Sequence, residues 1–363
     1  MIFFKTGPMT NKRITKIAKV LVDYSTNVQE GERVVITAPP VAQPLVLEIY
    51  KLCLQKGAHP VIRTPLPGAA YIFYKYAKEN QLTRFPKIAM YEMKNTDAYI
   101  AIRAPLNTNE FAGVEPGKIA VRSKVLSPVS KWRLQKTKWV AFDYPTTAYA
   151  QNAGMSLHDY QDFAFNAINL NWGRLKARLQ RIADAVNNAE KVSVVGPGTD
   201  LKFTVKSTRC VLGDGTNNMP GGEVFTAPDK YSVNGHITFN YPAIYRSNEV
   251  RGVQLKFKKG KVVEEDASSG LDFLRAMLDL DSGSRYVGEW GIGCNYNIKQ
   301  FTKNTLFDEK IGGTVHFALG HGYKECNAKI RSALHWDLVK DLRRNGEIYL
   351  DGKLFQKNGR FRR

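Results

Sequence analysis

Apolar residues in the first half of the chain recur at two spacings that alternate along the sequence. Positions three and four residues apart indicate amphipathic helices, and short continuous apolar runs indicate buried strands. The predicted elements, some helical and some extended, lie at 14–22, 33–37, 44–56, 60–63, 70–80, 85–93, 98–103, 118–134 and 139–143. Short apolar strands separated by helices predict an α/β domain with a largely parallel sheet covered on both faces.

The pattern changes after residue 189. Apolar residues from Phe165 to Val186 step by three and four, which predicts one long helix connecting the two halves. Beyond it, tight glycine turns join short strands in hairpins, at 192–195, 201–205, 253–257, 262–264, 348–350 and 353–355, with one helix at 271–280. We therefore predict two domains, an α/β domain over 1–189 and a β-rich α+β domain over 190–363.

Composition agrees with two domains and excludes a membrane protein. A chain of 363 residues can bury two substantial cores, and no apolar run approaches the roughly 20 residues that span a bilayer. The opening residues lack a basic lead, a hydrophobic region and a cleavage site, so they resemble a leader to a start near Met9. The four cysteines are widely scattered, which favours reduced thiols. We expect a cytoplasmic protein.

The formal net charge of +20 would draw the protein towards nucleic acid by nonspecific attraction. The basic residues are dispersed, however, and cluster only at 256–259 and 360–363. No recognisable nucleic-acid-binding motif accompanies them, so we expect solvated surface and no specific nucleic-acid partner.

The strongest chemical signal is a histidine and an aspartate two residues apart near the C-terminal end. If the segment Ser332–Asp337 is extended, His335 and Asp337 project on the same face, where an imidazole and a carboxylate can reach one cation. Glu223, Glu289 and His316 are each flanked by glycine or strand-forming residues. Together the five side chains supply two nitrogen and three carboxylate ligands, enough for two adjacent divalent ions.

Each of these residues taken alone has a simpler explanation. A single glutamate after a turn, such as Glu223 after Gly222, is usually solvated surface. A single histidine in an apolar strand, such as His316, is more often a core residue bonded to a backbone carbonyl. A turn through Gly322 can also return His321 or Tyr323 to the site. The metal hypothesis therefore depends on the whole set converging.

Several blocks of the sequence resemble the signature blocks of the thermophilic metalloaminopeptidase family, the aminopeptidase T and AmpS type. These blocks are 218–228, 304–309, 313–320 and 332–337, and the likeness extends over nearly the whole chain. The resemblance implies an aminopeptidase acting on peptides, a homodimer, and two divalent ions drawn from zinc, cobalt, manganese or magnesium. It assigns the ligands to Glu223, Glu289, His316, His335 and Asp337, and it makes Tyr323 the active-site tyrosine.

For such a site we expect peptide hydrolysis by a metal-activated water. Glu289 is our first choice for moving the proton to the leaving amine, and Glu223 is nearly as plausible because sequence does not say which carboxylate bridges the ions. Tyr323 would donate a hydrogen bond to the developing oxyanion.

Two other functions compete with hydrolysis. Two histidines and one carboxylate also form the facial triad of mononuclear iron oxygenases, and some ring-cleaving dihydroxypyridine dioxygenases are similar to this aminopeptidase family in fold. A single iron would leave Glu289 idle, whereas five engaged ligands call for a second ion. The third possibility is a basic nucleic-acid-binding protein with a vestigial metal site.

Overall fold

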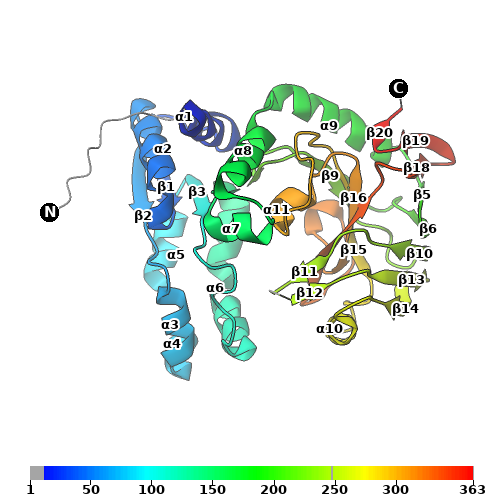
Figure 1. Cartoon of the computed structure of the whole chain (residues 1–363). Coiled ribbons are helices and arrows are strands. Elements are labelled where there is room, and N and C mark those ends of the chain that lie inside the picture. Colours follow the sequence, from blue (N-terminus) through cyan, green and yellow to red (C-terminus); the bar gives the residue numbers. More distant parts are fainter. Residues whose placement is uncertain (1–11, 247, 363) are drawn as a thin grey trace. The chain divides into compact units, whose positions relative to one another are not determined.

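The computed structural model describes residues 12–246 and 248–362, and the proposed start near Met9 lies outside them. The chain divides into two compact units (Figure 1). The first runs to Ala148 and includes Thr216–Met219; the second comprises Tyr149–Gly215 and the residues from Pro220 onward. The segment 149–189 is thus grouped with the β-rich part, and the division into domains at residue 189 stays a prediction.

The described residues of the first unit form a five-stranded parallel sheet in the order β2-β1-β3-β4-β8. Its strands are β1 (Arg33–Thr37), β2 (His59–Arg63), β3 (Ala98–Arg103), β4 (Lys138–Asp143) and β8 (Asn218–Met219). The helical segments are α1 (Lys12–Lys19), η1 (Val20–Ser25), η2 (Pro40–Ala42), α2 (Gln43–Gln55), α3 (Ala69–Tyr76), α4 (Glu79–Leu82), α5 (Lys87–Lys94) and α6 (Pro116–Lys136). Parallel strands linked through helices confirm the predicted α/β architecture.

Two predicted helices are interrupted. The helix expected at 70–80 is α3 followed by α4, because Ala77 and Lys78 adopt extended backbone angles. The prediction of one helix from Phe165 to Val186 was also wrong, since α8 (Leu157–Ile168) ends before α9 (Trp172–Asn187) begins. The Asn171 side chain accepts a hydrogen bond from Arg174 N and so starts a new helix. Because both helices bury apolar residues at helical spacing, the apolar pattern of the sequence does not reveal the break between them.

The second unit is built mainly from antiparallel strands. Its strands are β5 (Lys191–Gly196), β6 (Thr199–Thr204), β7 (Val211–Gly213), β9 (Glu223–Thr226), β10 (Asn234–Thr238), β11 (Ala243–Tyr245), β12 (Asn248–Val250), β13 (Gln254–Lys258), β14 (Lys261–Asp266), β15 (Val287–Gly293), β16 (Thr314–Gly320), β17 (His335–Asp341), β18 (Glu347–Leu350), β19 (Lys353–Lys357) and β20 (Arg360–Phe361). Short helices are α7 (Thr147–Asn152), α10 (Leu271–Leu278), α11 (Thr305–Asp308) and η3 (Lys324–Cys326).

These strands form two main sheets and the small hairpin β11-β12. The larger sheet has the order β14-β13-β10-β6-β5-β18-β19-β20, and the inner sheet has the order β17-β16-β15-β9-β7. The described residues thus confirm the predicted β-rich second part. Every residue of β15 and β16 is buried, so the inner sheet is covered on both faces.

One face of the inner sheet packs against the larger sheet. Phe203 of β6 contacts Trp290 of β15 and Phe317 of β16, with ring centroids 5.1 Å and 6.0 Å apart. Because side chains alternate along a strand, the neighbours of Trp290 and Phe317 project to the opposite face. That opposite face carries the candidate site.

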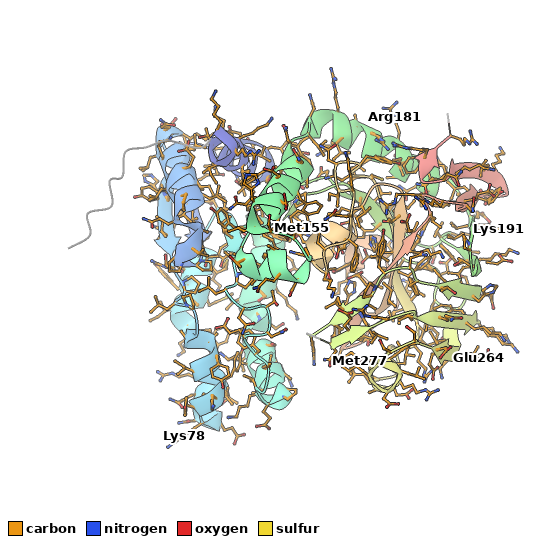
Figure 2. The ribbon with its side chains drawn as sticks, viewed as in Figure 1. Lys78, Met155, Arg181, Lys191, Glu264 and Met277 are labelled. Carbon is orange, nitrogen blue, oxygen red and sulfur yellow. The ribbon has the colours of Figure 1, made fainter. Side chains whose placement is uncertain are left out.

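Charged side chains lie mostly outside these cores. Arg181, Lys191 and Glu264 are exposed and project from the second unit (Figure 2). Within the described part of the chain, no helix has the length and apolar character needed to cross a membrane.

Asp281 fixes the segment that enters β17. Its carboxylate accepts hydrogen bonds from Ala333 N at 2.7 Å and Ser332 Oγ at 3.0 Å, and from Gly283 N at 2.8 Å within its own turn. Burial alone would raise the pKa of Asp281, but these hydrogen bonds lower it from 3.8 to about 2. The ionised carboxylate therefore stabilises the entrance to the strand that carries His335.

We predict that Asp281→Asn lowers the free energy of unfolding by about 1–2 kcal/mol at neutral pH. Because the folded-state pKa is depressed, this contribution is present above pH 3.8 and is lost as the pH falls towards about 2. Denaturant unfolding of both proteins at several pH values tests this. A stability difference that stays constant down to the acid limit would contradict the assignment.

Candidate metal centre

Strand register places all five predicted side chains on one face of the inner sheet. His316 pairs with Gly291, Asp337 with Ala318, and Glu223 with Gly293. Paired residues share a face, and residues two apart along a strand share it too. Glu289 and His335 therefore join the other three, although the five come from four strands.

The side chains meet at ion-pair distances. His316 Nε2 lies 3.2 Å from Glu289 Oε1 and 3.5 Å from Glu223 Oε2. His335 Nε2 lies 3.8 Å from Glu289 Oε2 and 3.6 Å from Asp337 Oδ2. Glu289 thus links the two histidines, and the five predicted residues form one cluster.

Glycines make room for two of these side chains. A Cβ atom on Gly291 would lie 2.1 Å from His316 Cε1, and one on Gly213 would lie 2.5 Å from Glu223 Cγ. Any larger residue at either position would occupy the space of the imidazole or the carboxylate. The glycine-rich strands are therefore part of how the sequence builds the cluster.

The cluster contains buried polar atoms that lack hydrogen bonds. Among the described residues, no hydrogen-bond partner is found for Glu223 Oε2, Glu289 Oε2, Asp337 Oδ1 or His316 Nδ1. Buried carboxylate oxygens without donors are costly unless a cation satisfies them. Carboxylate and imidazole donors in this arrangement fit divalent metal ions.

His335 is held in the orientation expected of a metal-binding imidazole. Its Nδ1 lies 2.8 Å from the backbone carbonyl oxygen of His321, so Nδ1–H donates to this carbonyl. Nε2 then faces Glu289 and Asp337 and is the nitrogen that a cation could reach. A second hydrogen bond of this kind fixes the tautomer of many metal-ligating histidines.

Charges in the cluster shift one another's protonation. Burial raises the pKa of Glu223 to about 7 and of Asp337 to about 6, although Lys310 and His335, respectively, act in the opposite direction. Burial lowers the pKa of His316, but its hydrogen bond to Glu289 and the nearby carboxylates raise it to about 10. The metal-free cluster therefore holds protons that a bound cation would displace.

Tyr323 lies at the edge of the cluster. Its Oη is 3.4 Å from His335 Nε2, and its ring packs edge-on against Phe225. The side chain is 41% exposed, yet desolvation of the hydroxyl and the charges of Glu289 and Asp337 raise its pKa well above 10. Tyr323 is therefore a neutral hydrogen-bond donor at neutral pH.

The sequence motifs did not identify two further candidate residues, Glu309 and Lys310. Glu309 joins Glu223 and His316 in one group whose ligand atoms lie within 4.8 Å of one another, while Glu289, His316 and Asp337 form a second such group. Lys310 is fully buried, with Nζ 3.2 Å from Glu223 Oε1. The run Asp308-Glu309-Lys310 resembles an ordinary solvated charge cluster. Two signals could have indicated otherwise: the signature block 304–309 ends at Glu309, and the run precedes the buried strand β16.

The donors and their burial fit the class of centre that binds divalent cations through imidazole and carboxylate groups. The chain belongs to the thermophilic metalloprotease (M29) family, whose model matches residues 10–361. The resemblance predicted from the sequence blocks is thereby confirmed. Membership in a metalloprotease family implies a divalent metal ion.

The most informative relatives are aminopeptidases. The chain is 29% identical over 350 residues to aminopeptidase 2 of Geobacillus stearothermophilus, covering 86% of this chain and 84% of that protein. It is 26% identical over 351 residues to aminopeptidase AmpS of Bacillus subtilis, covering 86% and 85%. Aminopeptidase T of Thermus thermophilus is 26% identical over 354 residues, covering 86% of each protein.

Two solved structures share the fold. Wild-type AmpT from Thermus thermophilus superposes with a TM-score of 0.84 at 22% identity, covering 96% of this chain and 99% of that chain. The 2,5-dihydroxypyridine dioxygenase from Pseudomonas putida superposes with a TM-score of 0.66 at 14% identity, covering 98% of each chain. At these identities the likeness concerns the fold alone.

We predict that Gly291→Ala impairs metal binding, because the added Cβ would displace the His316 imidazole. Overpacking should also cost about 1–3 kcal/mol of stability. Metal content after dialysis and the unfolding midpoint measure the two effects. Gly173→Ala is the control, since a Cβ on Gly173 would meet only the Asn171 side chain at 3.6 Å. Normal metal content in Gly291→Ala would argue against a role for His316.

Proposed function

We propose that this protein is a metal-dependent aminopeptidase that releases N-terminal residues from peptides. The single observation that carries the proposal is the convergence of Glu223, Glu289, His316, His335 and Asp337 on one buried sheet face. The proposal is supported by membership in the metalloprotease family and by relatives that are named aminopeptidases.

These five residues are the proposed ligands of two divalent ions. Glu289, His316 and Asp337 could hold one ion, and Glu223 and His316 could hold the other together with Glu309, which would be a further donor. We propose zinc, cobalt, manganese or magnesium, and the two imidazoles favour zinc or cobalt among them. When bound, such ions polarise a carbonyl group and lower the pKa of water towards neutrality.

Glu289 is the proposed proton carrier. Its Oε2 lacks a hydrogen-bond partner among the described residues, whereas Glu223 Oε1 lies 3.2 Å from the Lys310 ammonium. Because the Lys310 ammonium occupies one oxygen of Glu223, whereas Glu289 contacts only the two histidines, the contacts favour Glu289 as the group that exchanges protons. Glu289 would take a proton from the attacking water and pass it to the leaving amine.

Tyr323 is the proposed oxyanion donor. It remains protonated at neutral pH, and its hydroxyl lies beside His335 at the exposed edge of the cluster. A neutral donor at this edge can stabilise negative charge on the carbonyl oxygen as it develops.

The alternatives have less support. The dioxygenase shares the fold, but a single iron held by His316, His335 and one carboxylate would leave two of the three predicted carboxylates without a role as ligands. A nucleic-acid function would rest on the +20 charge alone, which is dispersed over the sequence. We further propose peptide substrates and a homodimer, as the family resemblance implies, and a cytoplasmic location, as the composition suggests.

Metal removal tests the proposal. Protein stripped by a chelator should be inactive on aminoacyl chromogenic substrates and should recover on addition of zinc, cobalt or manganese. His335→Ala should not recover, because one imidazole ligand is lost. His158→Ala is a suitable control, since that side chain is 83% exposed and lies in an exposed ion pair with Asp162, away from the five predicted ligands. Absence of turnover on every aminoacyl substrate would refute the peptidase function.

Metal stoichiometry separates hydrolysis from oxygenation. We expect elemental analysis of the purified chain to find about two divalent ions per chain. One iron per chain, with oxygen uptake on a dihydroxypyridine, would instead support the dioxygenase.

We predict that Tyr323→Phe lowers kcat about 100-fold while KM changes little, because the hydroxyl acts mainly on the developing oxyanion. Steady-state kinetics over a range of substrate concentrations measure the two constants, and metal content should stay unchanged. A rise in KM with unchanged kcat would assign Tyr323 to substrate binding instead.

A further inference from the structure

Lys310 is an internal cation built into one side of the candidate metal centre. It follows α11 and has no exposed surface. Its Nζ lies 3.2 Å from Glu223 Oε1 and forms a second ion pair with Glu309 Oε1. One ammonium group therefore joins two of the carboxylates in the cluster.

The other side of the centre contains no such cation. Glu289 and Asp337 make ion pairs with the histidines, and across residues 12–246 and 248–362 neither is paired with a lysine or an arginine. We call Glu223 and Glu309 the Lys310 half, and Glu289, His335 and Asp337 the open half. His316 belongs to both groups. The two halves differ in charge even though their donor types are similar.

We propose that the two halves hold divalent ions with unequal strength, a tight ion in the open half and a weak, exchangeable ion in the Lys310 half. Lys310 is the positioning residue that sets this difference. The inference deepens the proposed function, because it concerns the same two-ion centre.

The physical reason is competition between two cations for the same oxygens. An ion entering the Lys310 half either lies beside a fixed ammonium or draws the carboxylates away and leaves a buried ammonium unpaired. Each of these two outcomes weakens the binding of the ion in the Lys310 half. In the open half, no fixed ammonium competes with the ion for the oxygens of Glu289 and Asp337. The open half is therefore filled first as the free metal concentration rises.

An opposite effect of Lys310 is smaller. The ammonium also keeps two like-charged carboxylates together, which by itself would favour ion binding. Glu223, however, also has a contact that does not involve Lys310, because its side chain packs against Gly213. Glu309 is fixed by the end of α11, where its backbone N–H donates to Thr305 O at 3.2 Å. Removing the positive charge should thus matter more than losing the ion pairs.

Titration of the stripped full-length chain with cobalt tests the proposal, using calorimetry and the visible absorption of bound cobalt. Wild type should show two binding phases whose affinities differ by about tenfold or more. In Lys310→Met the second phase should tighten by about tenfold while the first stays unchanged. Glu309→Gln should weaken only the second phase.

Lys340→Met is the matched control. Lys340 is also fully buried, but it projects from the opposite face of β17, and its Nζ donates to Pro197 O at 2.7 Å. This variant loses a buried ammonium without changing the charge of the centre. Its two phases should match those of wild type.

Several outcomes would overturn the proposal. The first is that wild type binds both cobalt ions with equal affinity. The second is that the second binding phase of Lys310→Met has an unchanged or weaker affinity. The third is that Lys340→Met also binds the second ion more tightly than wild type does. If Lys310→Met does not fold, the titration of Glu309→Gln tests the proposal instead. A weaker first binding phase in Glu309→Gln would refute the assignment of the weak ion to the Lys310 half. The titrations contain no substrate, so failure of the aminopeptidase function, seen as absent turnover, is a separate result.

Discussion

The structure of the second unit depends on one electrostatic constraint: several carboxylates are buried together and require positive charge. Glu223, Glu289 and His316 are almost completely enclosed, and Asp337 is only slightly exposed. Removing carboxylates from water costs several kcal/mol each unless cations pair with them. In the metal-free protein, Lys310 and shared protons partly meet this need. Bound divalent ions would meet it fully, so the centre links folding energetics to metal binding.

The sheet geometry that creates this concentration of charge also limits the sequence. Side chains on the site face of β15 and β16 alternate with aromatic residues that pack against the larger sheet. Between the ionisable groups, the site face carries small residues such as Gly291 and Ala318. Large residues there would fill the space that the imidazole and carboxylate groups occupy. One face of these strands therefore carries bulky apolar side chains, and the other carries the ionisable groups with small residues between them.

Much of this organisation could be predicted from the sequence, and the failures have physical causes. The spacing of His335 and Asp337 is local, so a strand assignment was enough to place both on one face. The meeting of Glu223 with His316 depends on the strand order β17-β16-β15-β9, which no local pattern encodes; the family resemblance supplied it. Glu309 and Lys310 were missed because charged runs are usually exposed. The helix break at Asn171 was missed because apolar spacing continues across it.

The net charge of the donor set favours two divalent ions over one, whereas the fold does not distinguish the two possibilities. The aminopeptidase and the dioxygenase both share this fold, so topology alone is neutral between them. The two groups contain four carboxylates, and Lys310 supplies one positive charge. One divalent ion would leave the centre negative, which disfavours ionisation of water and an oxyanion near it. Two divalent ions leave a small positive excess, which favours both. With Lys310 beside Glu223, the charge balance therefore still accommodates the two ions of the proposed hydrolytic centre.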